Sequence, residues 1–70
     1  MLLNIDKPNR TATLHADSCR QVPDPLGTQL KPVGAIGRDG GWFQVESRSQ
    51  AESTVEREVP GLTLVHCSWC

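Results

Sequence analysis

The residues with the clearest chemistry lie in two short clusters near opposite ends of the chain. The first is an H-x-x-x-C pattern, His15 followed by Cys19, and the second is a C-x-x-C pattern, Cys67 followed by Cys70. Imidazole nitrogens and thiolates are ligands that Zn²⁺ prefers, and a tetrahedral ion needs four of them. The two clusters supply four such atoms and account for every cysteine in the chain. They predict one structural zinc site of three Cys and one His.

Other uses of the same residues are less favoured. A redox C-x-x-C pair needs its first cysteine at a helix N-terminus, which lowers the thiol pKa, and no helix is expected after Cys70. His66 is an alternative fourth ligand, but it would point to the opposite side of a strand from Cys67, so we favour His15. A closed four-ligand site leaves no open position for water, so we expect a structural ion and no enzymatic activity.

A metal ion that cross-links the chain (a staple) is expected because the chain has few apolar side chains to bury. It has 70 residues, of which 37% are hydrophobic, and its aromatic residues are Trp42, Phe43 and Trp69. Such a length fits a single domain, residues 1–70. Ordering so short a chain costs about as much free energy as a thin apolar core returns. Structural zinc in finger-sized units contributes ~10–16 kcal/mol, which is also folding free energy.

Short strands and one helix are expected to position the ligands. Apolar and β-branched runs predict strands at 2–5, 11–15, 42–46 and 62–65, the last of which leads into Cys67. The Pro- and Gly-rich stretch 22–41 predicts a loop, with one extended segment at 33–36. The sequence therefore predicts an α+β domain: a small zinc-stapled antiparallel sheet of three to four strands, with one helix before the last strand.

The expected helix has clear signals at both ends. Ser47 and Ser49 are both N-cap candidates, and Ser49 to Glu52 fits the capping-box pattern. An apolar stripe recurs every four residues, and Pro60-Gly61 ends the helix. The stripe consists of Ala51, Val55 and Val59.

Charge and hydropathy restrict the partners that the domain could take. Seven Lys and Arg against eight Asp and Glu give a net charge of −1, unlike an obvious nucleic-acid binder. A basic face remains an alternative, because five cations precede residue 40. No apolar run is long enough for an export signal or a membrane helix, so we expect a cytoplasmic protein without membrane contact, whose reduced cysteines bind metal. The five cations are Lys7, Arg10, Arg20, Lys31 and Arg38.

Three of the remaining residues are candidate partner contacts. Arg38 lies in a glycine-rich segment that lacks the G-K-[ST] ending of a phosphate-binding loop. Trp42 follows it, and a cation near an aromatic ring suits contact with a protein or a nucleic acid. Arg20 directly follows a ligand and is placed to offset the −1 charge that Zn²⁺ leaves on three thiolates. We expect no small-molecule substrate.

The order of these motifs resembles the metal-binding module of the Ada DNA-repair protein and the Ada-like zinc tails of some nucleases. The resemblance implies a zinc-stapled sheet plus helix, and contact with DNA. In that family the first ligand is a cysteine that accepts a methyl group, whereas this chain has His15, so methyl transfer does not carry over. The segment Pro23–Gly41 is also longer here. The matching motifs are His15-x-x-x-Cys19-Arg20-x-Val22, Trp42-Phe43-x-x-x-Ser47 leading into the Ala51 helix, Pro60-Gly61-Leu62 and Cys67-x-x-Cys70.

Two functions follow as hypotheses. The favoured one is a zinc domain that binds a protein partner, as an adaptor or an inhibitor. The alternative is a DNA-binding module of Ada-like type without methyl-transfer activity.

Overall fold

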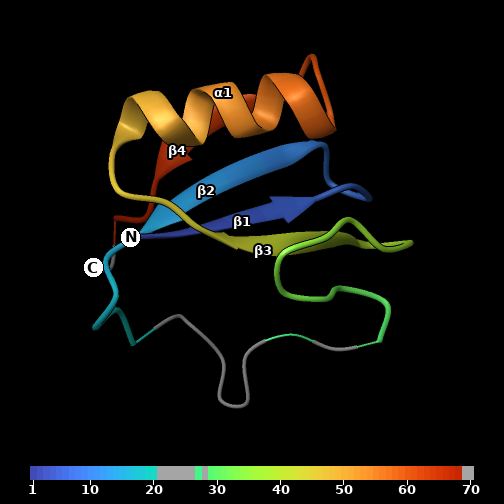
Figure 1. The fold of residues 1–70 in the computed structure, drawn as a ribbon, viewed down its shortest axis with the longest axis horizontal. Helices are drawn as coiled ribbons and strands as arrows, with labels where there is room; N and C mark the ends of the chain where they lie inside the picture. The colour runs from blue at the N-terminus through green and yellow to red at the C-terminus, as the bar shows by residue number, and fades with distance from the viewer. Residues whose placement is uncertain (21–26, 28, 69–70) are drawn as a thin grey trace.

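The chain folds into a four-stranded sheet with one helix lying across one of its faces (Figure 1). The computed structural model describes residues 1–20, 27 and 29–68. The elements are β1 (Leu2–Asp6), β2 (Thr11–His15), β3 (Gly40–Gln44), α1 (Arg48–Glu58) and β4 (Thr63–His66). They confirm the α+β class and the helix before the last strand. Within the described residues, no helix has the length and apolar character needed to cross a membrane.

The strand order of the sheet is β3-β1-β2-β4. β1 pairs antiparallel with both β2 and β3, whereas β4 pairs parallel with β2. The sheet is therefore mixed, and the predicted antiparallel arrangement does not extend to the last strand. The physical reason is the connection: parallel neighbours need a long crossover, and α1 carries the chain from β3 past the two central strands to the far edge.

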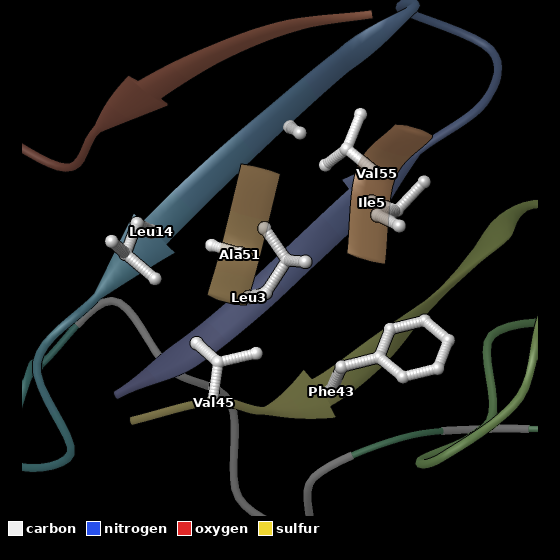
Figure 2. Packing of buried hydrophobic residues seen from close by; sticks show 8 residues of the cluster. Leu3, Ile5, Leu14, Phe43, Val45, Ala51 and Val55 are labelled. Carbon is white, nitrogen blue, oxygen red and sulfur yellow. The ribbon is translucent and has the colours of Figure 1, made fainter. Parts of the chain in front are cut away.

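The apolar core lies between α1 and one face of the sheet (Figure 2). Side chains alternate between the two faces of a strand, so every second residue of each inner strand points toward the helix. The predicted helix stripe is confirmed, since Ala51 and Val55 are buried and Val59 packs against the core. The buried cluster consists of Leu3, Ile5, Ala12, Leu14, Phe43, Val45, Ala51 and Val55.

The helix begins at the first of its two predicted caps. Ser47 is the N-cap, and its Oγ accepts a hydrogen bond from the Gln50 amide at 3.1 Å. The Gln50 side chain in turn accepts one from the Glu46 amide at 2.6 Å. The alternative capping box from Ser49 to Glu52 is wrong, because both residues already lie inside the helix.

An extended stretch before β3 pairs with the outer edge of that strand. The Trp42 amide donates to the Pro32 carbonyl at 2.9 Å, and the Gly34 amide donates to the Trp42 carbonyl at 2.7 Å. Val33 forms a parallel bridge with Trp42. Of the predicted extended segment at 33–36, only Val33 forms a bridge; the chain bends at Gly34, whose φ is +81°, and at Ala35. Positions 21–26 and 28 of the predicted loop lie outside the described residues.

Two glycines allow β3 to start where it does. Gly40 has a φ of +122°, and a Cβ there would overlap the carbonyl oxygen of Ile5. A Cβ on Gly41 would overlap the carbonyl oxygen of Ala35. Backbone cannot move aside as a flexible side chain can, so only glycine fits at either position.

Gly40→Ala is expected to lower the free energy of unfolding by about 2–5 kcal/mol, because positive-φ strain and overpacking add. Gly61→Ala is the matched control. Gly61 also has a positive φ, +92°, but its added Cβ would meet nothing within 4 Å. In Gly61→Ala the free energy of unfolding should fall only by the cost of positive-φ strain, about 1–3 kcal/mol. Urea unfolding of both variants measures the difference, and equal losses would contradict the collision with Ile5.

Candidate metal centre

Three of the four predicted ligands meet at one place. The ligand atoms of His15, Cys19 and Cys67 all lie within 4.8 Å of one another. The two sulfurs are 3.8 Å apart, although 48 residues separate the cysteines in the sequence. Two thiolates bound to one tetrahedral Zn²⁺, each at about 2.3 Å, are separated by about 3.8 Å. A bonded sulfur pair is far shorter, about 2.05 Å. The spacing is compatible with two ligands sharing an ion.

Parallel pairing of β2 and β4 brings His15 and Cys67 together. Leu14 is in register with His66, and the Cys67 amide donates to the Leu14 carbonyl at 3.0 Å. The next pair along the two strands is therefore His15 beside Cys67. Neighbours in a parallel ladder point to the same face of the sheet, and here that face is the one opposite α1. His66 is exposed, and it stands outside the group of His15, Cys19 and Cys67 that the described residues form.

A turn after β2 brings Cys19 back to the same place. The Cys19 amide donates to the Ala16 carbonyl at 3.0 Å, which closes the turn. Asp17 at its tip contacts the Met1 amine at 2.9 Å and accepts a hydrogen bond from the Gln44 side chain at 3.3 Å. The Met1 amine, followed by Gln44, holds the pKa of Asp17 below its ordinary value. These contacts tie the turn to the ends of β1 and β3.

His15 lies in a shielded position with a defined ring neighbour. His15 and Cys19 are both buried, with 6% and 7% of their surface exposed. The His15 ring is 5.9 Å from the Trp42 ring, centroid to centroid, and tilted by 38°. Burial, and after it the positive charge of Lys31, lower the pKa of His15. Both effects favour the neutral imidazole, which is the form that binds a metal ion.

The candidate partner contacts fall into two groups. Arg20 and Arg38 are exposed, and Arg38 pairs with Asp39 at 3.2 Å. Trp42 is buried, with 4% of its surface exposed, and its ring faces His15. Trp42 therefore offers a partner almost no surface, because β3 places it on the ligand face and the stretch from Pro32 covers its edge.

Sequence reasoning missed Lys31 as a neighbour of Trp42, whose ring contacts His15 of the candidate metal centre. Its Nζ lies 5.3 Å from the centroid of the Trp42 ring, within the range of a cation–π contact. Nothing in the local sequence signals this position, because Lys31 lies in a loop far along the chain from His15. The predicted fourth ligand, Cys70, lies outside the described residues and stays a prediction.

The oxidation state of Cys19 is the competing chemistry at this site. Cys19 is disulfide-bonded in the structure, and Cys67 is a free cysteine. A disulfide at Cys19 involves neither the Cys67 thiol nor the His15 imidazole, although the ligand atoms of both lie within 4.8 Å of the Cys19 sulfur. A metal ion accounts for all three positions at once. The two states exclude each other, because metal ligation requires the thiolate.

No family model, curated protein or solved structure matches the chain. The fold and the site define its class: an α+β domain with a group of one histidine and two cysteines, able to hold a metal ion, at one end of the sheet.

Cobalt substitution checks the ligand set. The reduced chain should bind Co²⁺ with the thiolate charge-transfer and intense d–d bands of a tetrahedral site. Cys19→Ser and Cys67→Ser should each weaken binding beyond the ~10–100-fold loss typical of outer-shell changes. His66→Ala is the control and should leave the bands and the affinity unchanged. If Cys67→Ser binds Co²⁺ as tightly as the wild-type chain does, Cys67 is not a ligand of the site.

Proposed function

We propose that this chain is a structural-zinc domain that serves as a macromolecular interaction module. The observation that carries the proposal is the 3.8 Å separation of the Cys19 and Cys67 sulfurs, with the His15 imidazole in the same group. Cys70 is proposed as the fourth ligand, three residues after Cys67 in the sequence.

The chemistry of the donors favours zinc. Thiolates and imidazole suit Zn²⁺, whereas Mg²⁺ and Ca²⁺ prefer oxygen ligands. Four protein ligands would close the coordination sphere, as in structural sites, and would leave no position for a reacting water. The burial of His15 and Cys19 fits an ion whose task is to hold the chain together.

The position of the site explains how the ion would stabilise so small a domain. Cys19 follows the second strand and Cys67 follows the last, so one ion joins segments that are 48 residues apart. The buried core itself consists of eight side chains. Metal binding of the size seen in zinc fingers, ~10–16 kcal/mol, would add the stability that this core lacks.

The surface next to β3 supports a protein partner. Leu30 and Val33 are exposed to 42% and 52%, and the Arg38 side chain in the same stretch is exposed to 74%. Aliphatic side chains beside a guanidinium group suit a partner surface that combines apolar and acidic residues. We propose that the domain binds another protein through this stretch, as an adaptor or an inhibitor, and carries out no catalysis.

One observation favours the alternative, a DNA-binding module of Ada-like type. The Lys7 amide donates to the Asp39 carbonyl at 3.1 Å, which sets the turn between β1 and β2 beside Arg38. Lys7, Arg10 and Arg38 are all exposed, so three cations share this end of the sheet. Methyl transfer is not proposed in either case, because His15 stands at the position of the family's acceptor cysteine.

Native mass spectrometry with and without a chelator tests the zinc proposal. The reduced chain should carry one Zn²⁺, and its removal should abolish the folded circular-dichroism spectrum. Cys67→Ser should bind no stoichiometric zinc, whereas His66→Ala should bind it normally. A chain that carries no metal, is lighter by two hydrogens and stays folded would contradict the proposal in favour of a disulfide.

Duplex binding across a salt series separates the two partner classes. For the protein-binding module we expect no measurable change in the anisotropy of a labelled duplex, even at low salt. A DNA-binding module using Lys7, Arg10 and Arg38 would bind, with a slope of log affinity against log salt of about −3. Lys7→Gln would then reduce that slope by about one. Such salt-dependent binding would overturn the favoured partner class.

A further inference from the structure

We infer that Lys31, held over the Trp42 ring, is the cation that offsets the charge of the metal centre, and that Trp42 positions the His15 imidazole. This inference rests on the proposed zinc site and deepens it. It replaces Arg20, which the sequence placed next to a ligand, with a residue from the loop before β3.

The charge of the centre creates the need for such a cation. Binding of Zn²⁺ to three thiols and one neutral imidazole releases three protons and takes the site from neutral to −1. A negative charge in a shielded environment is stabilised by a nearby positive group far more than in open water. A cation beside the site therefore favours the metal-bound, deprotonated form over the protonated one.

The geometry places Lys31 on the ring that contacts the His15 imidazole. Its Nζ is 5.3 Å from the Trp42 ring centroid, and that ring is 5.9 Å from the ring of His15. Lys31 itself is partly buried, whereas Arg20 is exposed and its charge is screened by water.

Trp42 contacts both Lys31 and His15. Its backbone holds the stretch after Lys31 at the edge of β3, through hydrogen bonds of 2.9 Å to Pro32 and 2.7 Å from Gly34. Its buried ring lies against His15 and limits the orientations that the imidazole can take. The stretch 31–34 therefore packs along Trp42, whose ring contacts His15. Trp42 acts on the ion only through His15, as a positioning residue.

The test compares two matched cations in the full-length, reduced chain. Zinc affinity is measured by competition with a chromophoric chelator at low salt. Lys31→Gln is expected to weaken binding about 10-fold, at the lower end for outer-shell partners. Lys31→Arg should restore most of that loss because it keeps the charge. Arg20→Gln, the control, should bind as wild type does.

The spectrum of the Co²⁺ form tests positioning separately from charge. Lys31→Gln should keep the wild-type d–d bands, since it changes no ligand. Trp42→Leu should shift those bands as well as weaken binding, and Trp42→Phe should shift them less because it keeps an aromatic ring against His15. Unchanged bands in Trp42→Leu would overturn the positioning role.

The possible failures are distinct. If wild type binds Zn²⁺ and Lys31→Gln binds it equally well, or Arg20→Gln is weakened as much as Lys31→Gln, the assignment to Lys31 is wrong and the zinc site stands. If the reduced wild-type chain binds no Zn²⁺, the proposed function fails and this inference fails with it.

Discussion

Parallel pairing of β2 with β4 is the constraint on which the candidate site depends. Parallel strands end at the same edge of a sheet, so the residues that follow them are neighbours. Here these residues are His15 and Cys67, in successive register after the pair of Leu14 and His66. An antiparallel β4 would carry Cys67 to the opposite end of β2, beside Thr11. The three ligand atoms could then not meet around one ion.

The helix makes this pairing possible, and it covers only one of the two faces of the sheet. α1 carries the chain from one edge strand to the other and covers one face with the apolar core (Figures 1 and 2). The opposite face holds His15 and Trp42. Because side chains alternate along a strand, one strand serves both faces: Leu14 packs in the core while His15 points to the candidate metal centre.

The long connection before β3 has a structural role beyond linking two strands. Hydrogen bonds to Trp42 hold residues 32–34 along the sheet edge. Gly41 lets β3 approach the Ala35 carbonyl of this connection, and Gly40 lets β3 approach the Ile5 carbonyl of β1. The connection brings Lys31 over the Trp42 ring and leaves aliphatic and cationic side chains exposed farther along. One segment thus contributes to the surroundings of the proposed ion and to the surface proposed for a partner.

The sequence by itself determined the features that local chemistry controls. The strand at 11–15 and the start of the helix at one of two capping serines follow from interactions spanning a few residues. Tertiary structure alone decided the parallel pairing of β4, the burial of Trp42 and the contact of Lys31 with the Trp42 ring. These depend on how the crossover helix and the long connection pack against the sheet. No short-range pattern encodes that packing, because it joins residues far apart in the chain.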